Sequence, residues 1–122
     1  MIDHLSLGAT NLERSVAFYR HLFAPLGYAQ QHANDTEASF GPGTDRTFWL
    51  YPAANAVAMT GMHIAFAAKD NIAVDHAFAA ATAGGATVAR PPGPRPEISD
   101  TYYGCIVLDP DGHRLEIVVA PM

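Results

Sequence analysis

The sequence has little cysteine, a shortage of basic residues and no long uninterrupted apolar run. Its single cysteine, Cys105, has no partner for a disulfide within the chain. No basic start precedes an unbroken apolar stretch, so we expect a cytoplasmic location. The longest mostly apolar segment, residues 57–68, is interrupted by Thr60, Gly61 and His63, and a membrane-spanning helix needs about 20 apolar residues. Seven basic against 12 acidic residues argue against a nucleic-acid or membrane partner.

Several catalytic signatures are also missing from the chain. It contains no Gly-x-Gly-x-x-Gly, no phosphate-binding loop, no Ser-His-Asp order and no paired Cys-x-x-Cys. These absences exclude the usual nucleotide, serine-hydrolase and structural-zinc sites. What is present is a chain of 122 residues with 49% apolar and 16% charged residues. This composition predicts one globular domain over residues 1–122 with a buried core.

The chain reads as two similar halves. Residues 2–8 alternate apolar and polar side chains, which is typical of a strand with one buried face. Thr10 and Glu13 then form a capping-box pattern, and apolar residues recur at helical spacing until residues 25–27. The strand pattern returns 59 residues later, where His63 takes the place of His4. Two copies of such a unit are expected to share one core.

The second half continues in the same order. A helix is expected after Asp70 or Asn71 and ends at Gly84-Gly85, and residues 102–108 and 114–119 form a terminal hairpin. The predicted fold is α+β, with two βαβββ modules, about 1–55 and 60–122, that form a cupped mixed sheet around a central cavity with the helices outside. Residues 90–97 hold four prolines and are expected to form a stiff loop, either a lid or a solvated connector.

Three side chains in predicted strands are candidates for a metal site. The repeat gives His4 and His63 equivalent positions facing one cavity, and Glu116 interrupts an apolar run in which an unpaired buried carboxylate would be costly. Two imidazoles and a carboxylate can hold a divalent ion and leave positions open for water and substrate. Either histidine alone is more often a hydrogen-bonded core residue, whereas the pairing favours the metal.

Aromatic and basic residues surround this candidate site. An offset of 67 residues places the segment 47–51 on 114–118, so that Trp49 is the equivalent of Glu116. Trp49 and Tyr51 are expected to line the substrate cavity, although Trp49 fits core packing equally well. Arg95, on the proline-rich segment, is expected to meet an acidic substrate group, although an exposed loop arginine is usually only solvated.

The register of the terminal hairpin decides which tyrosine faces the cavity. If Asp109 opposes Gly112, Cys105 lies opposite Glu116, and Tyr103 points into the cavity as a catalytic donor to substrate. A slip of one residue would replace Tyr103 by Tyr102 as the substrate-binding side chain. Cys105 is expected to be a small packing residue.

These segments resemble the glyoxalase / bleomycin-resistance / extradiol dioxygenase family, also called the vicinal oxygen chelate superfamily. The resemblance covers nearly the whole chain and is carried by five segments: residues 2–7, 16–19, 25–28, 62–66 and 108–117. It implies paired βαβββ modules, a divalent metal ion (Fe, Mn, Zn or Ni) at His4, His63 and Glu116, with Glu116 also catalytic, and a homodimer. In exchanged dimers of this family, His4 of one subunit would join His63 and Glu116 of the other.

The resemblance leaves two functional classes open. One is a metal-dependent enzyme that chelates two neighbouring oxygens of a small substrate, with lyase or extradiol-type dioxygenase chemistry. Glyoxalase I enzymes have a second glutamate where this chain has Trp49, and indole neither ligates a metal nor acts as a base. The other class is a bleomycin-resistance-type protein that binds a small molecule without turnover. Retention of all three ligand positions favours the enzyme.

Overall fold

A computed structural model describes residues 1–55 and 58–119 of the chain. The first module contains β1 (Leu5–Ala9), α1 (Leu12–Phe23), the short 3-10 helix η1 (Ala24–Leu26), β2 (Tyr28–Ala33), β3 (Ala38–Pro42) and β4 (Phe48–Pro52). The second module contains β5 (Ile64–Ala67), α2 (Asn71–Ala83), β6 (Thr87–Pro94), β7 (Tyr103–Leu108) and β8 (Arg114–Val119). The elements therefore follow the predicted order of strand, helix and three strands in each half.

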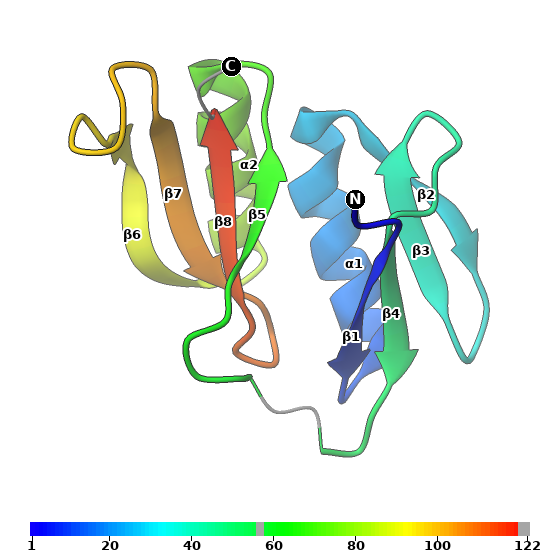
Figure 1. The fold of residues 1–122 in the computed structure, drawn as a ribbon. Helices are drawn as coiled ribbons and strands as arrows, with labels where there is room; N and C mark the ends of the chain where they lie inside the picture. Colours follow the sequence, from blue (N-terminus) through cyan, green and yellow to red (C-terminus); the bar gives the residue numbers. More distant parts are fainter. Residues whose placement is uncertain (56–57, 120–122) are drawn as a thin grey trace.

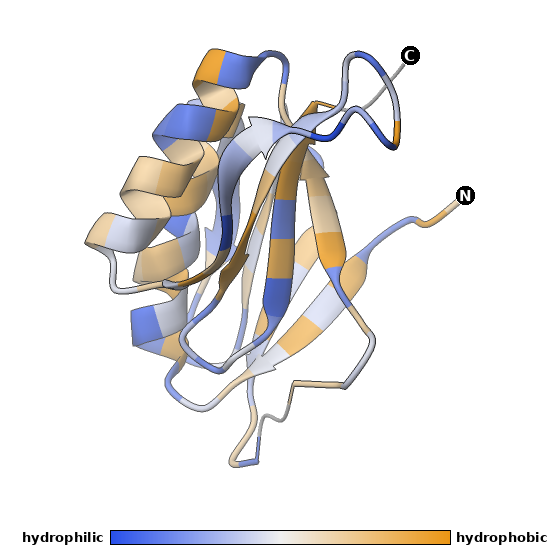
Figure 2. Ribbon diagram, turned by 90° about the vertical axis from the view of Figure 1, so that its left-hand side faces the viewer, coloured by the Kyte–Doolittle hydropathy of each residue, from blue (hydrophilic) through white to orange (hydrophobic). Residues whose placement is uncertain are grey.

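Each module forms one four-stranded mixed sheet. The strand orders are β1-β4-β3-β2 and β5-β8-β7-β6, with the first pair of each sheet parallel and the others antiparallel. Figure 1 shows the two sheets side by side, with β5 and β1 at the adjoining edges. Both helices cover the same side of the sheets, and the opposite side is open (Figure 2). The predicted α+β fold with two modules, an open curved sheet and helices outside is confirmed.

The strand register confirms the internal repeat. In the first module Ser6 of β1 lies beside Trp49 of β4, and in the second Ala65 of β5 lies beside Glu116 of β8. These are the equivalences that the two sequence offsets predict. Trp49 and Glu116 therefore occupy matching places on the open faces of the two sheets.

Polar caps fix the ends of both helices. The side chain of Asn11 accepts a hydrogen bond from the Arg14 N–H at 3.0 Å and caps α1. The predicted cap at Thr10 is therefore wrong by one residue, because the Thr10 hydroxyl donates to Asp111 of the second module instead. In α2 the cap is Asp70, as predicted, and the helix ends at Gly84 followed by Gly85 in the left-handed region, with φ +89°.

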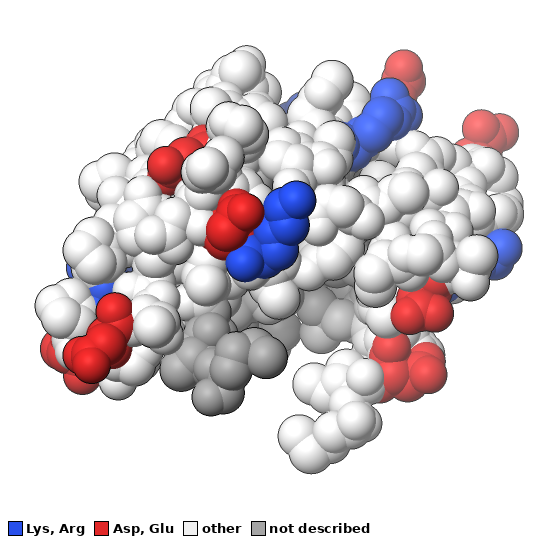
Figure 3. All heavy atoms as spheres, turned by 90° about the horizontal axis from the view of Figure 1, so that it is seen from above, with Lys and Arg blue, Asp and Glu red and all other residues white. Residues whose placement is uncertain are grey.

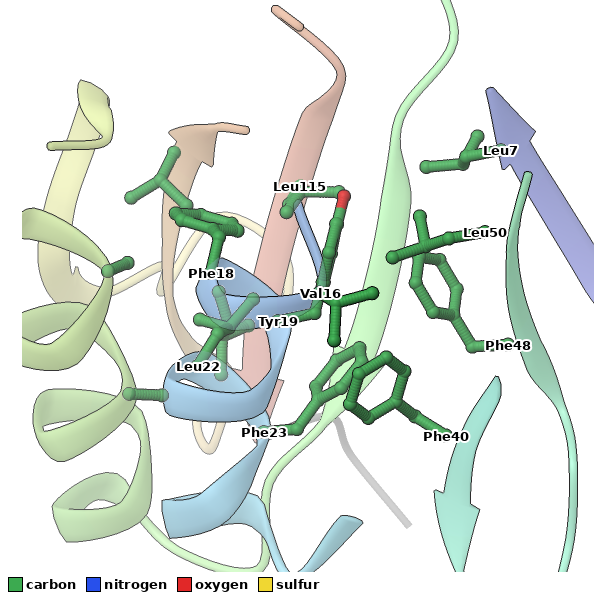
Figure 4. Packing of buried hydrophobic residues seen from close by; sticks show 14 of the residues in the cluster. Leu7, Val16, Phe18, Tyr19, Leu22, Phe23, Phe40, Phe48, Leu50 and Leu115 are labelled. Atoms are coloured by element: carbon green, nitrogen blue, oxygen red, sulfur yellow. The ribbon is translucent and has the colours of Figure 1, made fainter. Parts of the chain in front are cut away.

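The core lies between the helices and the inner faces of both sheets. Phe23 of α1 packs edge-on against Phe48 of β4 and Phe66 of β5, with ring centroids 5.4 and 4.9 Å apart. Figure 4 shows Tyr19 and Phe23 directed from α1 towards the strands. Since Phe66 belongs to the second module, one aromatic cluster joins both halves.

The turn of the terminal hairpin is one residue longer than the sequence predicts. One oxygen of Asp109 accepts from the backbone N–H groups of Asp111 and His113, and Asp109 N–H donates to the His113 carbonyl, each at 2.9 Å. The turn therefore closes on His113 rather than Gly112. Glu116 consequently lies opposite Ile106, not Cys105. The first of the two registers considered is wrong, and the slipped one is found.

Residues 90–94 are not a loop. They belong to β6, which pairs with β7 in a register shifted at two places, around Arg90 and before Gly93. Prolines are tolerated there because β6 is an edge strand, whose outward N–H positions need no partner in the sheet. The prediction of a stiff loop is therefore wrong for this part, and the connection to β7 begins only at Arg95.

The turn after β7 also joins the two modules. Tyr19 of α1 donates a buried hydrogen bond to Asp109 at 2.6 Å, and the ring nitrogen Nε2 of His113 lies 3.0 Å from the Gly8 carbonyl oxygen. Asp111 accepts from the Thr10 backbone N–H at 3.2 Å and pairs with Arg14 at 3.3 Å. We call residues 109–113 the docking turn, because it seats the second module on the β1–α1 corner of the first.

Two surface properties bear on partners. In the described part of the chain, the helices are too short or too polar to cross a bilayer. On the face seen in Figure 3, the described basic side chains are dispersed and lie near acidic ones rather than merging into a basic patch. This distribution agrees with the acidic net charge of −5.

Candidate metal centre and aromatic hollow

Glu116 is the centre of a small polar group on the open face of the second sheet. Its side chain is only 8% exposed, and its Oε1 lies 3.5 Å from Nε2 of His63. Its Oε2 accepts a hydrogen bond from the Tyr102 hydroxyl at 3.0 Å. The imidazole and the carboxylate are close, yet their separation is long for a hydrogen bond. Their facing nitrogen and oxygen atoms are therefore available to a shared cation.

The strand pleat explains why these side chains meet. Leu115 and Ile117 point into the core, so Glu116 between them points to the open face. On β7 the neighbouring position is Gly104, where an added Cβ would lie 2.9 Å from the Ile117 carbonyl oxygen and 3.5 Å from Oε2 of Glu116. A glycine at this position avoids a clash with the Ile117 carbonyl oxygen and lets β7 approach the Glu116 strand closely.

Tyr102 owes its properties to this environment. Desolvation by burial, followed by the hydrogen bond to Glu116 and the negative charge of that carboxylate, raises the pKa of Tyr102. The phenol therefore stays protonated near neutral pH and donates to Glu116. Sequence reasoning assigned Tyr102 to substrate, whereas the structure shows it oriented towards Glu116. Residues 102, 104 and 106, in and just before β7, alternate onto one face, and this alternation could have placed Tyr102 beside Glu116. It does so only once the hairpin register is known, because the register decides which of these residues lie opposite Glu116.

His4 lies apart from this group within one chain. Its Nδ1 is 2.7 Å from Oδ1 of Asp3, and the two side chains are 56% and 96% exposed. Across residues 1–55 and 58–119, no three His, Cys, Asp or Glu side chains gather closely enough to hold a metal ion. The described chain thus brings His63 and Glu116 together and leaves His4 on the first module.

His4 instead lines a hollow on the open face of the first module. The hollow has a volume of about 560 Å³, and its walls include Trp49 and Tyr51 of β4. The indole and phenol rings are parallel within 10°, with centroids 6.1 Å apart. The indole N–H donates to the Arg46 carbonyl at 2.9 Å, which fixes the ring orientation. Trp49 is therefore not a core residue but part of an open aromatic surface.

Tyr103 and Cys105 point away from the candidate metal centre. The Tyr103 hydroxyl donates to Asp75 of α2 at 2.7 Å, and this hydrogen bond, together with burial, raises the pKa of Tyr103. Cys105 is fully buried, and desolvation raises the pKa of its thiol to about 11. The cysteine is the packing residue that the sequence predicts. Tyr103 is on the helix side of the sheet because the docking turn shifts the register by one residue.

Arg95 is close to the candidate centre through its backbone. Its N–H donates to the Tyr102 carbonyl at 2.8 Å, and its guanidinium pairs with Glu97. The hydrogen bond from Arg95 holds the pKa of Glu97 below its usual range. An acidic substrate group would therefore compete with Glu97 for this arginine.

The space between the adjoining sheet edges has a different character. It is a cavity of about 270 Å³ lined mostly by apolar side chains, among them Leu5 of β1, Phe48 of β4 and Ile64 of β5. None of the predicted metal ligands lines it. The candidate metal ligands lie instead on the open faces of the two sheets, with His4 on the first and His63 and Glu116 on the second.

The match to a family model gives the class of protein. The family model described as the Glyoxalase/Bleomycin resistance protein/Dioxygenase superfamily matches residues 1–117. The chain belongs to this superfamily.

Individual members of the superfamily are similar to the chain in sequence or in structure. The metallothiol transferase FosB of Shouchella clausii (strain KSM-K16) is 28% identical over 120 residues, which cover 95% of this chain and 77% of that protein. The crystal structure of a glyoxalase/bleomycin resistance protein from Albidiferax ferrireducens T118 superimposes with a TM-score of 0.84, 30% identity and 98% coverage of both chains. The fosfomycin resistance protein FosX from Mesorhizobium loti shares the fold, with a TM-score of 0.75, 20% identity, and coverage of 100% of this chain and 93% of that one.

Proposed function

We propose that the protein is a metal-dependent enzyme that acts on a small molecule with two neighbouring oxygen atoms. One observation carries the proposal: the nearly buried carboxylate of Glu116 faces the exposed imidazole of His63 across 3.5 Å. Membership of a superfamily in which one relative is named a metallothiol transferase supports it. Lyase, extradiol-type dioxygenase and thiol-transfer reactions are the chemistries to test.

The donor set fits a divalent cation. A buried carboxylate is unfavourable unless a partner compensates its charge, and an imidazole that ligates a metal does so through a nitrogen lone pair. Imidazole nitrogen with carboxylate oxygen suits Zn, Mn, Fe or Ni. Tyr102 donates to one carboxylate oxygen, and the other faces His63, so that His63 and Glu116 would together hold the ion.

His4 of a second copy of the chain is the proposed third ligand. The repeat gives His4 on the first module the place that His63 has on the second. A two-fold dimer that sets the first sheet of one copy over the second sheet of the other would form two identical sites. Each site would then combine His63 and Glu116 with His4, Trp49 and Tyr51 from the second copy.

The chemistry divides between the ion and the side chains. A bound divalent ion would polarise substrate oxygens and stabilise negative charge that develops on them. Tyr102 keeps Glu116 oriented, and Arg95 lies where an acidic substrate group would pair with it. In the dimer, Trp49 and Tyr51 would form one wall of the site. Tyr103, bound to Asp75, takes no part in this arrangement.

Mixing two inactive variants tests the two-chain site. His4→Ala and His63→Ala homodimers should each bind Mn²⁺ or Zn²⁺ at least about tenfold more weakly than the parent. A heterodimer of the two variants contains one site with both substitutions and one with none. It should recover one high-affinity site, measured by calorimetry after purification with two different affinity tags.

The outcomes separate the alternatives. Variants that retain parental affinity would refute the metal proposal. Weak binding in both homodimers without recovery in the heterodimer would refute the two-chain site. Light scattering of the parent provides the oligomeric state in the same experiment.

The second candidate function is small-molecule binding without turnover. The aromatic hollow beside His4 favours it, because aromatic walls suffice to hold a ligand without any metal. Assays with catechol and with the glutathione–methylglyoxal adduct discriminate the two functions. Turnover that disappears in His63→Ala with an intact fold supports the enzyme. Absence of turnover in the metal-loaded parent, with ligand affinity unchanged in His63→Ala, supports the binding protein.

A further inference from the structure

We propose that the open face of β4, formed by Trp49 and Tyr51, binds a planar aromatic ring that is uncharged or cationic. The assignment of this ring to the enzyme's substrate rests on the proposed function. Ring binding itself does not, because the face belongs to the first module and is complete in one chain.

The first argument is the geometry of the two aromatic side chains. They are two residues apart on one strand, so both project to the same face, and their planes differ by only 10°. Tyr51 is 40% exposed although its ring is apolar, and it is among the large hydrophobic side chains that the fold leaves open. Parallel rings on an open sheet face offer a third ring an aromatic face or edge to pack against.

The second argument is that the surface is held rigid. The indole N–H is bonded to the Arg46 carbonyl at 2.9 Å, so the donor is satisfied and the ring face is left for stacking. Its neighbours across the sheet are serines, Ser6 on β1 and the fully buried Ser39 on β3, and the His32 ring lies beside it with centroids 6.3 Å apart. Tyr51 has Gly8 beside it on β1. A ligand would thus meet a preformed site, which lowers the entropy lost on binding.

The third argument is the size and charge of the hollow. Its volume of about 560 Å³ exceeds that of a single ring and lies within the usual range for ligand pockets. Its walls carry two carboxylates, Asp3 and Asp45, against one guanidinium, Arg46, besides His4. This balance disfavours an anionic ring and favours a neutral or cationic one, which also gains a cation–π contribution from indole.

The position of His4 connects the ring to the metal. His4 lines the same hollow as the two aromatic residues. If His4 ligates the ion in the proposed site, the part of the substrate that extends from the ion reaches Trp49 and Tyr51.

Trp49 is the single tryptophan of the chain, so its fluorescence reports directly on this face. The protein, treated with chelator, is titrated with phenol and with cyclohexanol, which have similar size and one hydroxyl each but differ in planarity. N-methylpyridinium and benzoate form a second pair that differs in the sign of the charge. We expect saturable quenching by phenol and N-methylpyridinium, with the benzoate and cyclohexanol affinities at least about fivefold weaker.

Variants at position 51 provide the matched control. Tyr51→Ala removes the ring and should weaken phenol binding about fivefold, whereas Tyr51→Phe keeps the ring and should bind as the parent does. Equal binding of phenol and cyclohexanol, benzoate binding as tight as that of N-methylpyridinium, or no difference between Tyr51→Ala and Tyr51→Phe would overturn the inference.

The test is independent of the metal proposal. Quenching that fails while metal binding needs His63 refutes the aromatic site alone. Quenching that persists when no variant affects metal binding refutes the enzyme and leaves the aromatic site as that of a binding protein.

Discussion

At the scale of single residues, Tyr102 and Tyr103 are neighbours with opposite environments. Tyr102 donates to Glu116 on the open face, and Tyr103 donates to Asp75 on the helix side. Adjacent residues of a strand point to opposite faces, so one hydroxyl supports the candidate metal centre and the other supports the packing of α2.

This contrast gives a prediction with a built-in control. Tyr102→Phe removes the hydrogen bond that orients Glu116 and should weaken Mn²⁺ or Zn²⁺ binding by about tenfold or more, as loss of a ligand's hydrogen-bond partner usually does. Tyr103→Phe removes an equivalent bond far from Glu116 and should leave metal affinity unchanged. Calorimetric titration of both variants measures the difference. Equal affinities would show that Tyr102 does not position the carboxylate.

At the scale of elements, the two adjacent glycines at the end of α2 have different backbone conformations. Gly85 has φ +89°, a backbone conformation that a side chain strains, whereas Gly84 has φ −83° and is open to ordinary contacts. Gly85→Ala should therefore lower the free energy of unfolding by about 1 kcal/mol. Gly84→Ala should change it little, and urea denaturation of the pair would reveal the difference. Equal losses would mean that the left-handed conformation at Gly85 is not what the fold requires.

The elements also show what the sequence could predict. The repeat offsets correctly aligned Trp49 with Glu116, because strand pairing preserves the spacing of equivalent residues in both modules. The hairpin register was not predictable from the Asp-Pro-Asp-Gly pattern, since it depends on whether the Asp109 carboxylate also accepts a hydrogen bond from the His113 N–H. The proline-rich β6 was missed because an edge position, which tolerates proline, is visible only in the finished sheet.

At the scale of the whole molecule, the docking turn makes the two modules one unit. Asp111 is nearly buried and accepts hydrogen bonds from Thr10 while it pairs with Arg14. Asp111→Ala should therefore lower the free energy of unfolding by about 2 kcal/mol. The exposed Asp100 provides a control, and Asp100→Ala should have little effect.

Two probes show whether this loss is shared by both modules. Trp49 fluorescence reports on the first module, and far-ultraviolet circular dichroism reports on both. If the turn couples the modules, the two unfolding curves of Asp111→Ala should shift together. A fluorescence transition that stays at the parental midpoint would contradict this coupling.

The candidate site belongs to this scale as well. The sequence identified His63 and Glu116, which the structure places face to face, because the repeat and the apolar run around Glu116 single them out. It could not predict that His4 would lie apart from the pair, on the open face of the other module, since the packing of one module on the other fixes that separation. Whether His4 meets the pair in a dimer is therefore a property of assembly rather than of the chain.

The docking turn has a practical consequence for the covalent link between β4 and β5. The docking turn is hydrogen-bonded to Gly8, Thr10 and Tyr19 of the first module, and these bonds do not depend on that link. A protease site engineered into the link and then cut should leave two fragments that elute together under native conditions. The same halves, expressed from separate genes, should reassemble and offer a reporter of proximity between fused proteins.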